Sequence, residues 1–123
     1  LYDGRDAVAA CVGKTISECE LDKHYADAGC LIIKFTDTTS LRISDYGQCC
    51  CEARYIVCDD DLNLAGAKFL GIELKEYQDD EDDTGVHEIQ FLDVITDTGR
   101  IQLATHNEHN GYYGGFSIRA QLF

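Results

Sequence analysis

Basic residues are scarce in this chain of 123 residues. Ten Lys and Arg stand against 23 Asp and Glu, and the formal net charge is −13. A protein that coats nucleic acid needs a basic footprint, and an anionic membrane surface attracts basic segments. The composition therefore argues against DNA, RNA or a membrane as partner. A small anionic ligand stays compatible with it, because a few arginines that converge on one pocket can hold a phosphate.

Long apolar runs are also missing. No segment approaches the roughly 20 apolar residues of a membrane span. The N-terminal stretch Leu1-Tyr2-Asp3-Gly4 lacks the basic region and apolar core of a secretory signal. We therefore expect a protein of the cytoplasm, in which the thiols stay reduced.

Paired C-x-x-C spacing is absent, although the chain has seven cysteines. Cys49, Cys50 and Cys51 are contiguous, and side chains alternate sides in an extended chain, so they do not form a tetrahedral site. His106 and His109 stand three residues apart, but no third ligand follows at a diagnostic spacing and the segment is not H-E-x-x-H. The sequence therefore predicts no metal site and no cofactor.

Alternation of apolar and polar residues dominates the chain. It predicts an α+β fold that is mostly antiparallel β, with about seven short strands joined by hairpins. The expected strands lie near residues 15–21, 30–35, 41–46, 55–58, 67–76, 87–97 and 100–105, and residues 116–123 form a strand or a short helix. The length favours a single domain over residues 1–123, as a sandwich or an open barrel.

Two short helical segments interrupt this pattern. Residues 5–12 are rich in helix formers, with Asp3 as the expected cap and Gly13 as the stop. Val8, Cys11 and Val12 would share the buried face of this helix, since their spacing is i, i+3, i+4.

The middle of the chain carries two acidic clusters. Asp59 to Asp61 are expected to cap a single helical turn over residues 62–66. The run from Asp79 to Asp83 is expected to be a solvated loop, because like charges repel and the run lacks the spacing and the central glycine of an EF-hand.

The most concentrated set of ligand-binding residue types lies between His106 and Phe116. This stretch carries two histidines, two asparagines, one glutamate, three glycines and three aromatic rings. Asn-Gly and Gly-Gly allow close backbone approach, and tyrosines offer flat faces with a polar handle. The stretch predicts a wall for a flat polar ring such as a nucleobase. An ordinary hairpin loop packed by its own aromatics fits the composition as well.

Catalytic chemistry has weaker support. Cys50 or Cys51 with His106 and Asn107 has the residue types of a Cys-His-Asn arrangement, but the glutamate after Cys51 would raise the thiol pKa and oppose activation. We therefore expect no catalytic residue and no enzyme. A small nucleotide hydrolase or lyase that uses His106 and Glu108 as acid and base stays open as an alternative.

Ligand capture is the interpretation that uses most of these residues. Arginine binds phosphate in a bidentate way and stacks on bases, and amides read the edges of bases and sugars. For any single arginine, a cross-strand pair with one of the many acids is the competing explanation. The residues expected to contact the ligand are Arg54, Phe91, Asn107, Asn110, Tyr112, Tyr113 and Arg119.

Three segments carry a resemblance to a known family. They are Leu41-Arg42-Ile43, Cys50-Cys51-Glu52-Ala53-Arg54-Tyr55-Ile56 followed by Asp61-Leu62 and Gly66, and the stretch from His106 to Phe116. Together they resemble the phage-encoded Thoeris anti-defence sponges of the first-described type, over nearly the whole chain. The most specific element is Asn110 to Tyr113 combined with Cys50 to Glu52. Relatives have other residues in place of His106 and His109.

The resemblance implies a non-catalytic protein in the cytoplasm of a bacterial host. Such a sponge binds the cyclic ADP-ribose isomer made by a bacterial TIR-domain enzyme, does not cleave it, and thereby blocks Thoeris immunity. The family forms homo-oligomers, dimers with pockets between subunits, and some members assemble into hexamers. Some members also bind cyclic oligonucleotides at a separate site. An acidic inhibitor that mimics nucleic acid and binds a basic host protein is a further alternative, which strong salt dependence would indicate.

Overall fold

The fold is a two-layer β-sandwich. It is described by a computed structural model over residues 2–25, 28–47, 52–82, 85–111 and 114–123. In this part of the chain, eight strands form two four-stranded sheets of order β1-β2-β3-β8 and β4-β7-β6-β5, and neighbouring strands run antiparallel. The elements are α1 (Arg5–Cys11), β1 (Ile16–Asp22), β2 (Cys30–Phe35), β3 (Ser40–Asp45), β4 (Ala53–Cys58), β5 (Phe69–Asp82), β6 (Gly85–Thr96), β7 (Gly99–His109) and β8 (Ile118–Leu122).

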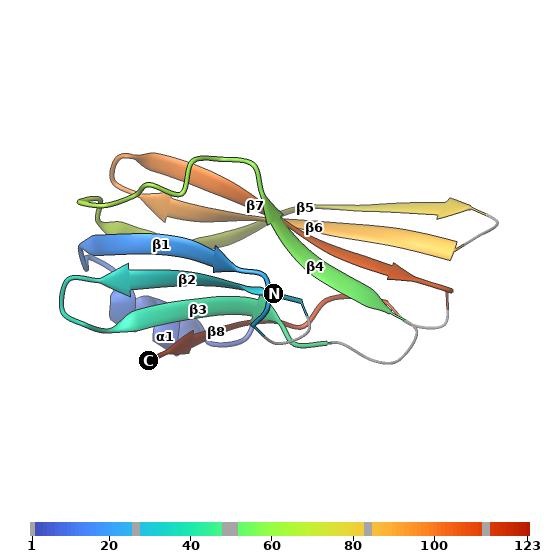
Figure 1. Cartoon of the computed structure of the whole chain (residues 1–123), viewed down its shortest axis with the longest axis horizontal. Helices are drawn as coiled ribbons and strands as arrows, with labels where there is room; N and C mark the ends of the chain where they lie inside the picture. Colours follow the sequence, from blue (N-terminus) through green and yellow to red (C-terminus); the bar gives the residue numbers. More distant parts are fainter. Residues whose placement is uncertain (1, 26–27, 48–51, 83–84, 112–113) are drawn as a thin grey trace.

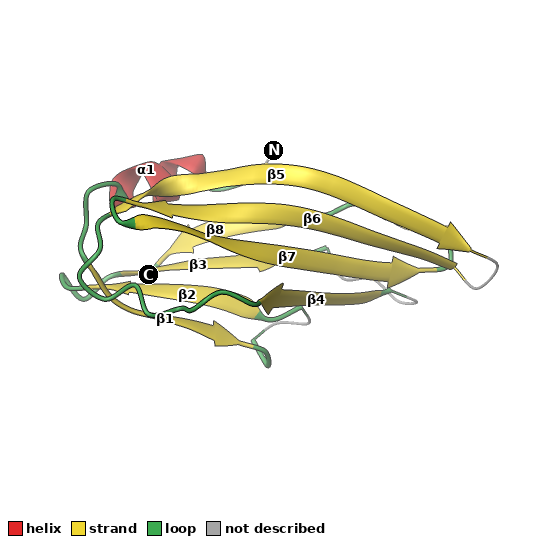
Figure 2. Ribbon diagram, turned by 90° about the horizontal axis from the view of Figure 1, so that it is seen from above, coloured by secondary structure: helices red, strands yellow, loops and turns green. Residues whose placement is uncertain are grey.

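The two sheets pack face to face, as Figures 1 and 2 show. Every second side chain of a strand points inward, so Leu31 and Ile33 of β2 meet Leu92 of β6 and Leu103 of β7 in one buried core. The prediction of a mostly antiparallel β fold with a short N-terminal helix is therefore confirmed, and the sandwich replaces the open barrel. In the described part of the chain, no helix is long and apolar enough to cross a membrane.

Helix α1 contacts β8 and β5, the edge strands of the two sheets. Its N-cap is Gly4 with φ 94°, without a side-chain cap, so the predicted Asp3 cap is wrong. The Asp3 carboxylate instead accepts a hydrogen bond from the Gly4 N–H at 3.0 Å. Val8 and Cys11 are buried as expected, but Val12 is 51% exposed because the helix ends at Cys11 and Val12 is extended.

Two predictions about the acidic segments are wrong. Residues 59–68 contain no helical turn: they form an irregular connection in which the Asp61 carboxylate accepts a hydrogen bond from the Asn63 N–H at 3.0 Å. This local contact replaces the first turn of a helix. Residues 79–82 are not a loop but the end of β5, because they pair with β6 from Glu88 to Gly85.

The second sheet is longer than the first. Strands β5, β6 and β7 have 14, 12 and 11 residues, whereas the strands of the first sheet have five to seven. At roughly 3.3 Å per residue the difference amounts to about 20 Å. The β5–β6 hairpin therefore projects beyond the first sheet, as Figure 1 shows. Among the described residues, no strand of the first sheet lies opposite the inner face of this projecting end.

Candidate functional site

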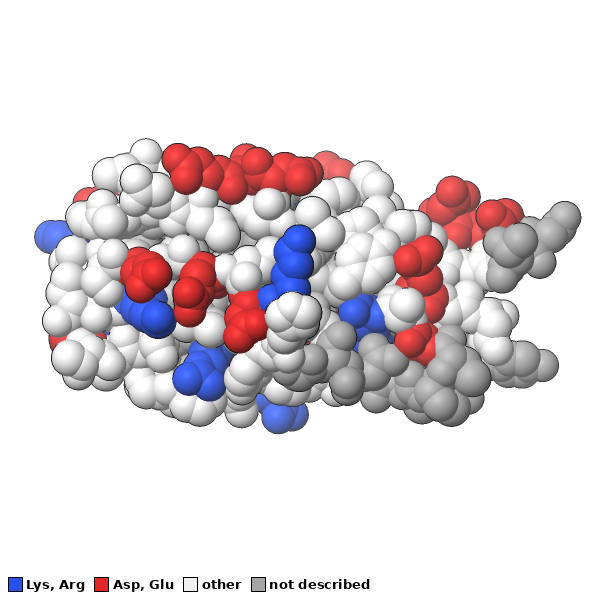
Figure 3. All heavy atoms as spheres, viewed as in Figure 1, with Lys and Arg blue, Asp and Glu red and all other residues white. Residues whose placement is uncertain are grey.

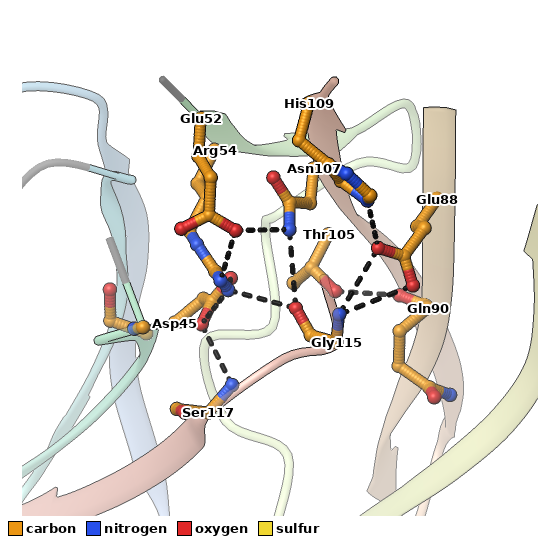
Figure 4. A network of polar contacts seen from close by, with 12 residues as sticks. Asp45, Glu52, Arg54, Glu88, Gln90, Thr105, Asn107, His109, Gly115 and Ser117 are labelled. Atoms are coloured by element: carbon orange, nitrogen blue, oxygen red, sulfur yellow. Dashed lines mark hydrogen bonds and ion pairs between the residues drawn. The ribbon is translucent and has the colours of Figure 1, made fainter. Parts of the chain in front are cut away.

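Side chains on the inner face of the second sheet change from apolar to polar toward the projecting end. Along β7, Ile101 and Leu103 belong to the core, whereas the next inner positions are Thr105, Asn107 and His109, all buried. The same change occurs along β4 and β6. The resulting inner polar cluster, shown in Figure 4, consists of Asp45, Glu52, Arg54, Glu88, Asn107 and His109.

Arg54 is held by two buried carboxylates. Its Nη1 donates to Asp45 Oδ2 at 2.8 Å and to Oδ1 at 3.1 Å, and its Nη2 donates to Glu52 Oε2 at 2.8 Å. The three side chains are 4%, 0% and 2% exposed. Burial alone would lower the pKa of Arg54, but the two carboxylates outweigh it and raise the pKa. The guanidinium is therefore charged and fixed in one orientation. A Cβ on Gly47 would lie 2.6 Å from Nη1, so the cluster also requires a glycine there.

Asn107 lies opposite Arg54 in the β4–β7 register and is fully buried. Its Nδ2 donates to Glu52 Oε2 at 2.9 Å and to the Gly115 carbonyl at 3.3 Å. Both partners are acceptors, so the orientation of the amide is determined. Its Oδ1 then has no hydrogen-bond partner among the described residues. In Figure 4 this oxygen points between Glu52 and His109.

Glu88 and His109 form the other half of the cluster. His109 Nε2 lies 2.5 Å from Glu88 Oε1, the Tyr77 hydroxyl donates to Oε2, and the Gly115 N–H donates to both oxygens at 3.1 and 3.2 Å. Burial raises the pKa of Glu88, but these hydrogen bonds together outweigh it, so the pKa is lowered. Glu88 is therefore an ionised carboxylate in a buried position.

The predicted contact residues do not all lie on one surface of the single chain. Arg54 and Asn107 come together in the inner polar cluster, whereas Phe91 lies on the outer face of β6, because Leu92 is the inward neighbour. Phe91 lines a hollow of about 90 Å³ together with Asp59 and Asp60. The single chain therefore does not form the predicted pocket of Arg54 with Phe91.

Arg119 is on the outer side of β8. It pairs with Asp3 at 3.4 Å, lies over the ring of Tyr46 at 5.3 Å, and lines a groove of about 420 Å³ with Tyr2 and Phe116. Asn110 is exposed directly after β7. Tyr112 and Tyr113 lie outside the described residues.

His106 and Glu108 lie on the outer face of β7, and the residues between His106 and His109 are strand rather than loop. His106 Nδ1 is 2.8 Å from His87 Nε2, and its ring stacks on Tyr55 at 4.6 Å. Burial and the neighbouring His87 lower the pKa of His106. Because His106 points outward and Asn107 inward, the two cannot act together in a Cys-His-Asn arrangement. Cys50 and Cys51 lie outside the described residues.

The lowered pKa of His106 predicts a pH-dependent stability. The unfolded chain binds a proton at His106 more readily than the folded chain does, so stability falls as the pH drops below about 6.5. We expect a His106→Gln variant to lose less stability than the wild type between about pH 6.5 and 5, measured by urea unfolding. The matched control is His24→Gln at an exposed position, which should keep the wild-type slope.

Comparison with known proteins gives one match. Residues 9–118 match the family described as a domain of unknown function, DUF7448. The chain belongs to this family. Searches of curated proteins and of solved structures gave no significant match.

The DUF7448 match begins inside α1 and ends at the first residue of β8. It includes every residue of the inner polar cluster, whereas Arg119 lies one residue beyond it. In the described part of this DUF7448 domain, no three His, Cys, Asp or Glu side chains are grouped to hold a metal ion.

Four cluster residues were not among the predicted contact residues: Asp45, Glu52, Glu88 and His109. Glu88 could have been predicted, because it shares one face of β6 with Gln90, Leu92 and Val94, which alternate along the strand. No alternation along one strand marks Asp45 and Glu52. Their approach to Arg54 depends on how β3 and β4 lie relative to each other.

Proposed function

We propose that this domain is a non-catalytic binding protein for a cyclic ADP-ribose isomer made by a bacterial TIR-domain enzyme. By sequestering this signal in the host cytoplasm, a phage-encoded copy would block Thoeris immunity. The observation that carries the proposal is the buried Asn107 amide, whose Oδ1 has no partner among the described residues and stands beside a fixed Arg54. The resemblance of the segments around these two residues to the sponge family supplies the ligand class.

A buried acceptor without a donor costs about 1–3 kcal/mol. An amine or hydroxyl of a bound nucleotide would supply the missing donor to Asn107 Oδ1 and recover this free energy. The buried Nε–H of Arg54, on the neighbouring strand, also has no hydrogen-bond partner among the described residues, so the pair offers one donor and one acceptor. Asp45 and Glu52 already fix Arg54, but Asn107 is 0% exposed, so a ligand must displace the groups that cover Oδ1 before it can bind there.

The arrangement of the single chain favours a homo-oligomer. Arg54 and Asn107 face inward, whereas Phe91 and Arg119 lie on outer faces. One ligand could contact all four residues only if two chains supply them. We therefore propose a dimer with pockets between its subunits, which further association to a hexamer would preserve. Cyclic oligonucleotides at a separate site would be an additional ligand class.

The surface charge suits a small ligand better than a polyanion. Figure 3 shows acidic side chains along the upper edge of the molecule and near its projecting end, whereas Lys and Arg lie mostly in the middle and lower part of this face. This face would repel DNA and RNA, whereas a small nucleotide needs only a local donor set. The same acidic surface is what an inhibitor of a basic host protein would use.

A hydrolase or lyase is the second candidate, favoured by the neighbouring outward positions of His106 and Glu108. The lowered pKa of His106 would keep the imidazole neutral, as a general base requires. Glu108, however, is hydrogen-bonded to Tyr55, and the hollow of about 220 Å³ beside it is lined by His87 and His109 rather than by His106.

Recovery of the ligand separates these candidates. The purified protein is incubated with the product of a TIR-domain enzyme, freed of unbound nucleotide and heated, and the released material is identified by mass spectrometry. The sponge predicts intact cyclic ADP-ribose isomer. A degraded product that disappears in a His106→Ala variant would establish the enzyme instead, and recovery of no nucleotide would refute both.

A further inference from the structure

Gly115 connects the two halves of the inner polar cluster. Its N–H donates to both carboxylate oxygens of Glu88, at 3.1 and 3.2 Å. Its carbonyl accepts from Arg54 Nη1 at 3.0 Å and from Asn107 Nδ2 at 3.3 Å. Figure 4 shows this residue between the two halves. The hydrogen bonds to Glu88 therefore fix the position at which the Gly115 carbonyl meets Arg54 and Asn107.

His109 has one tautomer in this arrangement. Its Nδ1 accepts a hydrogen bond from the Gly111 N–H at 3.0 Å, so this nitrogen carries no proton. The proton then lies on Nε2, which donates to Glu88 Oε1 at 2.5 Å. The same His–Glu pair thus binds the backbone at Gly111 and at Gly115.

The chain passes close to this pair. A Cβ on Gly114 would lie 2.7 Å from Glu88 Oε1 and 3.3 Å from His109 Nε2. Backbone can approach so closely only at a glycine. The Tyr77 hydroxyl from β5 also donates to Glu88, so two neighbouring strands, β5 and β7, and the segment before β8 fix the position of this carboxylate.

We propose that Glu88 and His109 are positioning residues of the ligand site. They clamp the backbone at Gly111 and Gly115, and the Gly115 carbonyl held in this way is a third acceptor for Arg54, beside Asp45 and Glu52, and a second acceptor for Asn107, beside Glu52. The effect on ligand binding rests on the proposed function, whereas the clamp itself is a property of the free protein.

Two variants of His109 test the clamp. The amide of a glutamine can donate to Glu88 in place of Nε2, but it does not replace the Nδ1 acceptor for Gly111; alanine replaces neither. We expect His109→Ala to weaken binding of the purified TIR product by about 10- to 100-fold, and His109→Gln to retain affinity within about threefold of the wild type. Thermal melting confirms that both variants are folded at the temperature of the titration.

Amide hydrogen exchange, followed by NMR without ligand, gives the second readout. In His109→Ala the Gly111 and Gly115 amides should both exchange faster, whereas in His109→Gln only Gly111 should. Unchanged exchange of Gly115 in the alanine variant, or equal loss of affinity in both variants, would overturn the proposal. If the wild type binds no nucleotide, the proposed function fails, and the exchange of Gly115 still decides whether the clamp exists.

Discussion

Replacing Arg54 by alanine is expected to lower the free energy of unfolding by about 3–5 kcal/mol. The variant would remove the guanidinium that pairs with the carboxylates of Asp45 and Glu52, both almost fully buried. It would also remove a donor from the Gly115 carbonyl. Since domains of this size are stable by only about 5–15 kcal/mol, the loss approaches the whole stability of the weaker members of that range.

Urea unfolding followed by circular dichroism measures this loss. The control is Arg100→Ala, because Arg100 also contacts two carboxylates, Glu73 and Asp93, but the Arg100 and Glu73 side chains are 51% and 48% exposed and only Asp93, at 10%, is largely buried. An exposed pair such as Arg100–Glu73 contributes at most about 1 kcal/mol, so Arg100→Ala should lose clearly less stability than Arg54→Ala. Similar losses in the two variants would show that the Arg54 ion pairs are no stronger than surface pairs.

Replacing Asn107 by alanine is expected to weaken binding of the cyclic ADP-ribose isomer by about 10- to 100-fold. The variant would remove the Oδ1 acceptor that the free protein leaves without a partner among the described residues. It would also release the Gly115 carbonyl and Glu52 Oε2 from their shared donor. Titration calorimetry below the melting temperature of the variant measures the change.

Asn63→Ala is the matched control for this prediction. Asn63 lies exposed in the connection between β4 and β5, away from the inner polar cluster. Its variant should bind as the wild type does. An Asn107→Ala variant with wild-type affinity would remove Asn107 from the ligand site.

Local sequence was sufficient to predict elements that depend on a single strand or on one hairpin. The alternation over residues 87–97 predicted a strand, and β6 occupies Gly85–Thr96. The strands expected near residues 30–35 and 41–46 are β2 and β3, and the Asp37 carboxylate accepts from the Thr39 N–H in the turn of the hairpin that they form.

The features that the sequence did not predict depend on hydrogen-bonded pairing between separate strands. Residues 79–82 carry like charges that favour a loop, yet the ladder with β6 holds them in β5. The pairing of β4 with β7 sets Arg54 beside Asn107, and no local pattern specifies that register. The projecting end of the second sheet explains why polar residues stand at inward positions, and this length difference is visible only once all strands are paired.

Titration of the purified cyclic ADP-ribose isomer into the protein tests the central claim most directly. Sequestration of a scarce messenger requires a dissociation constant near nanomolar, about −12 kcal/mol. Two equivalent pockets in a two-fold dimer predict one ligand per chain, recovered intact afterwards. A dissociation constant above micromolar would contradict the account. A heat signal from cleavage of the nucleotide would contradict it as well.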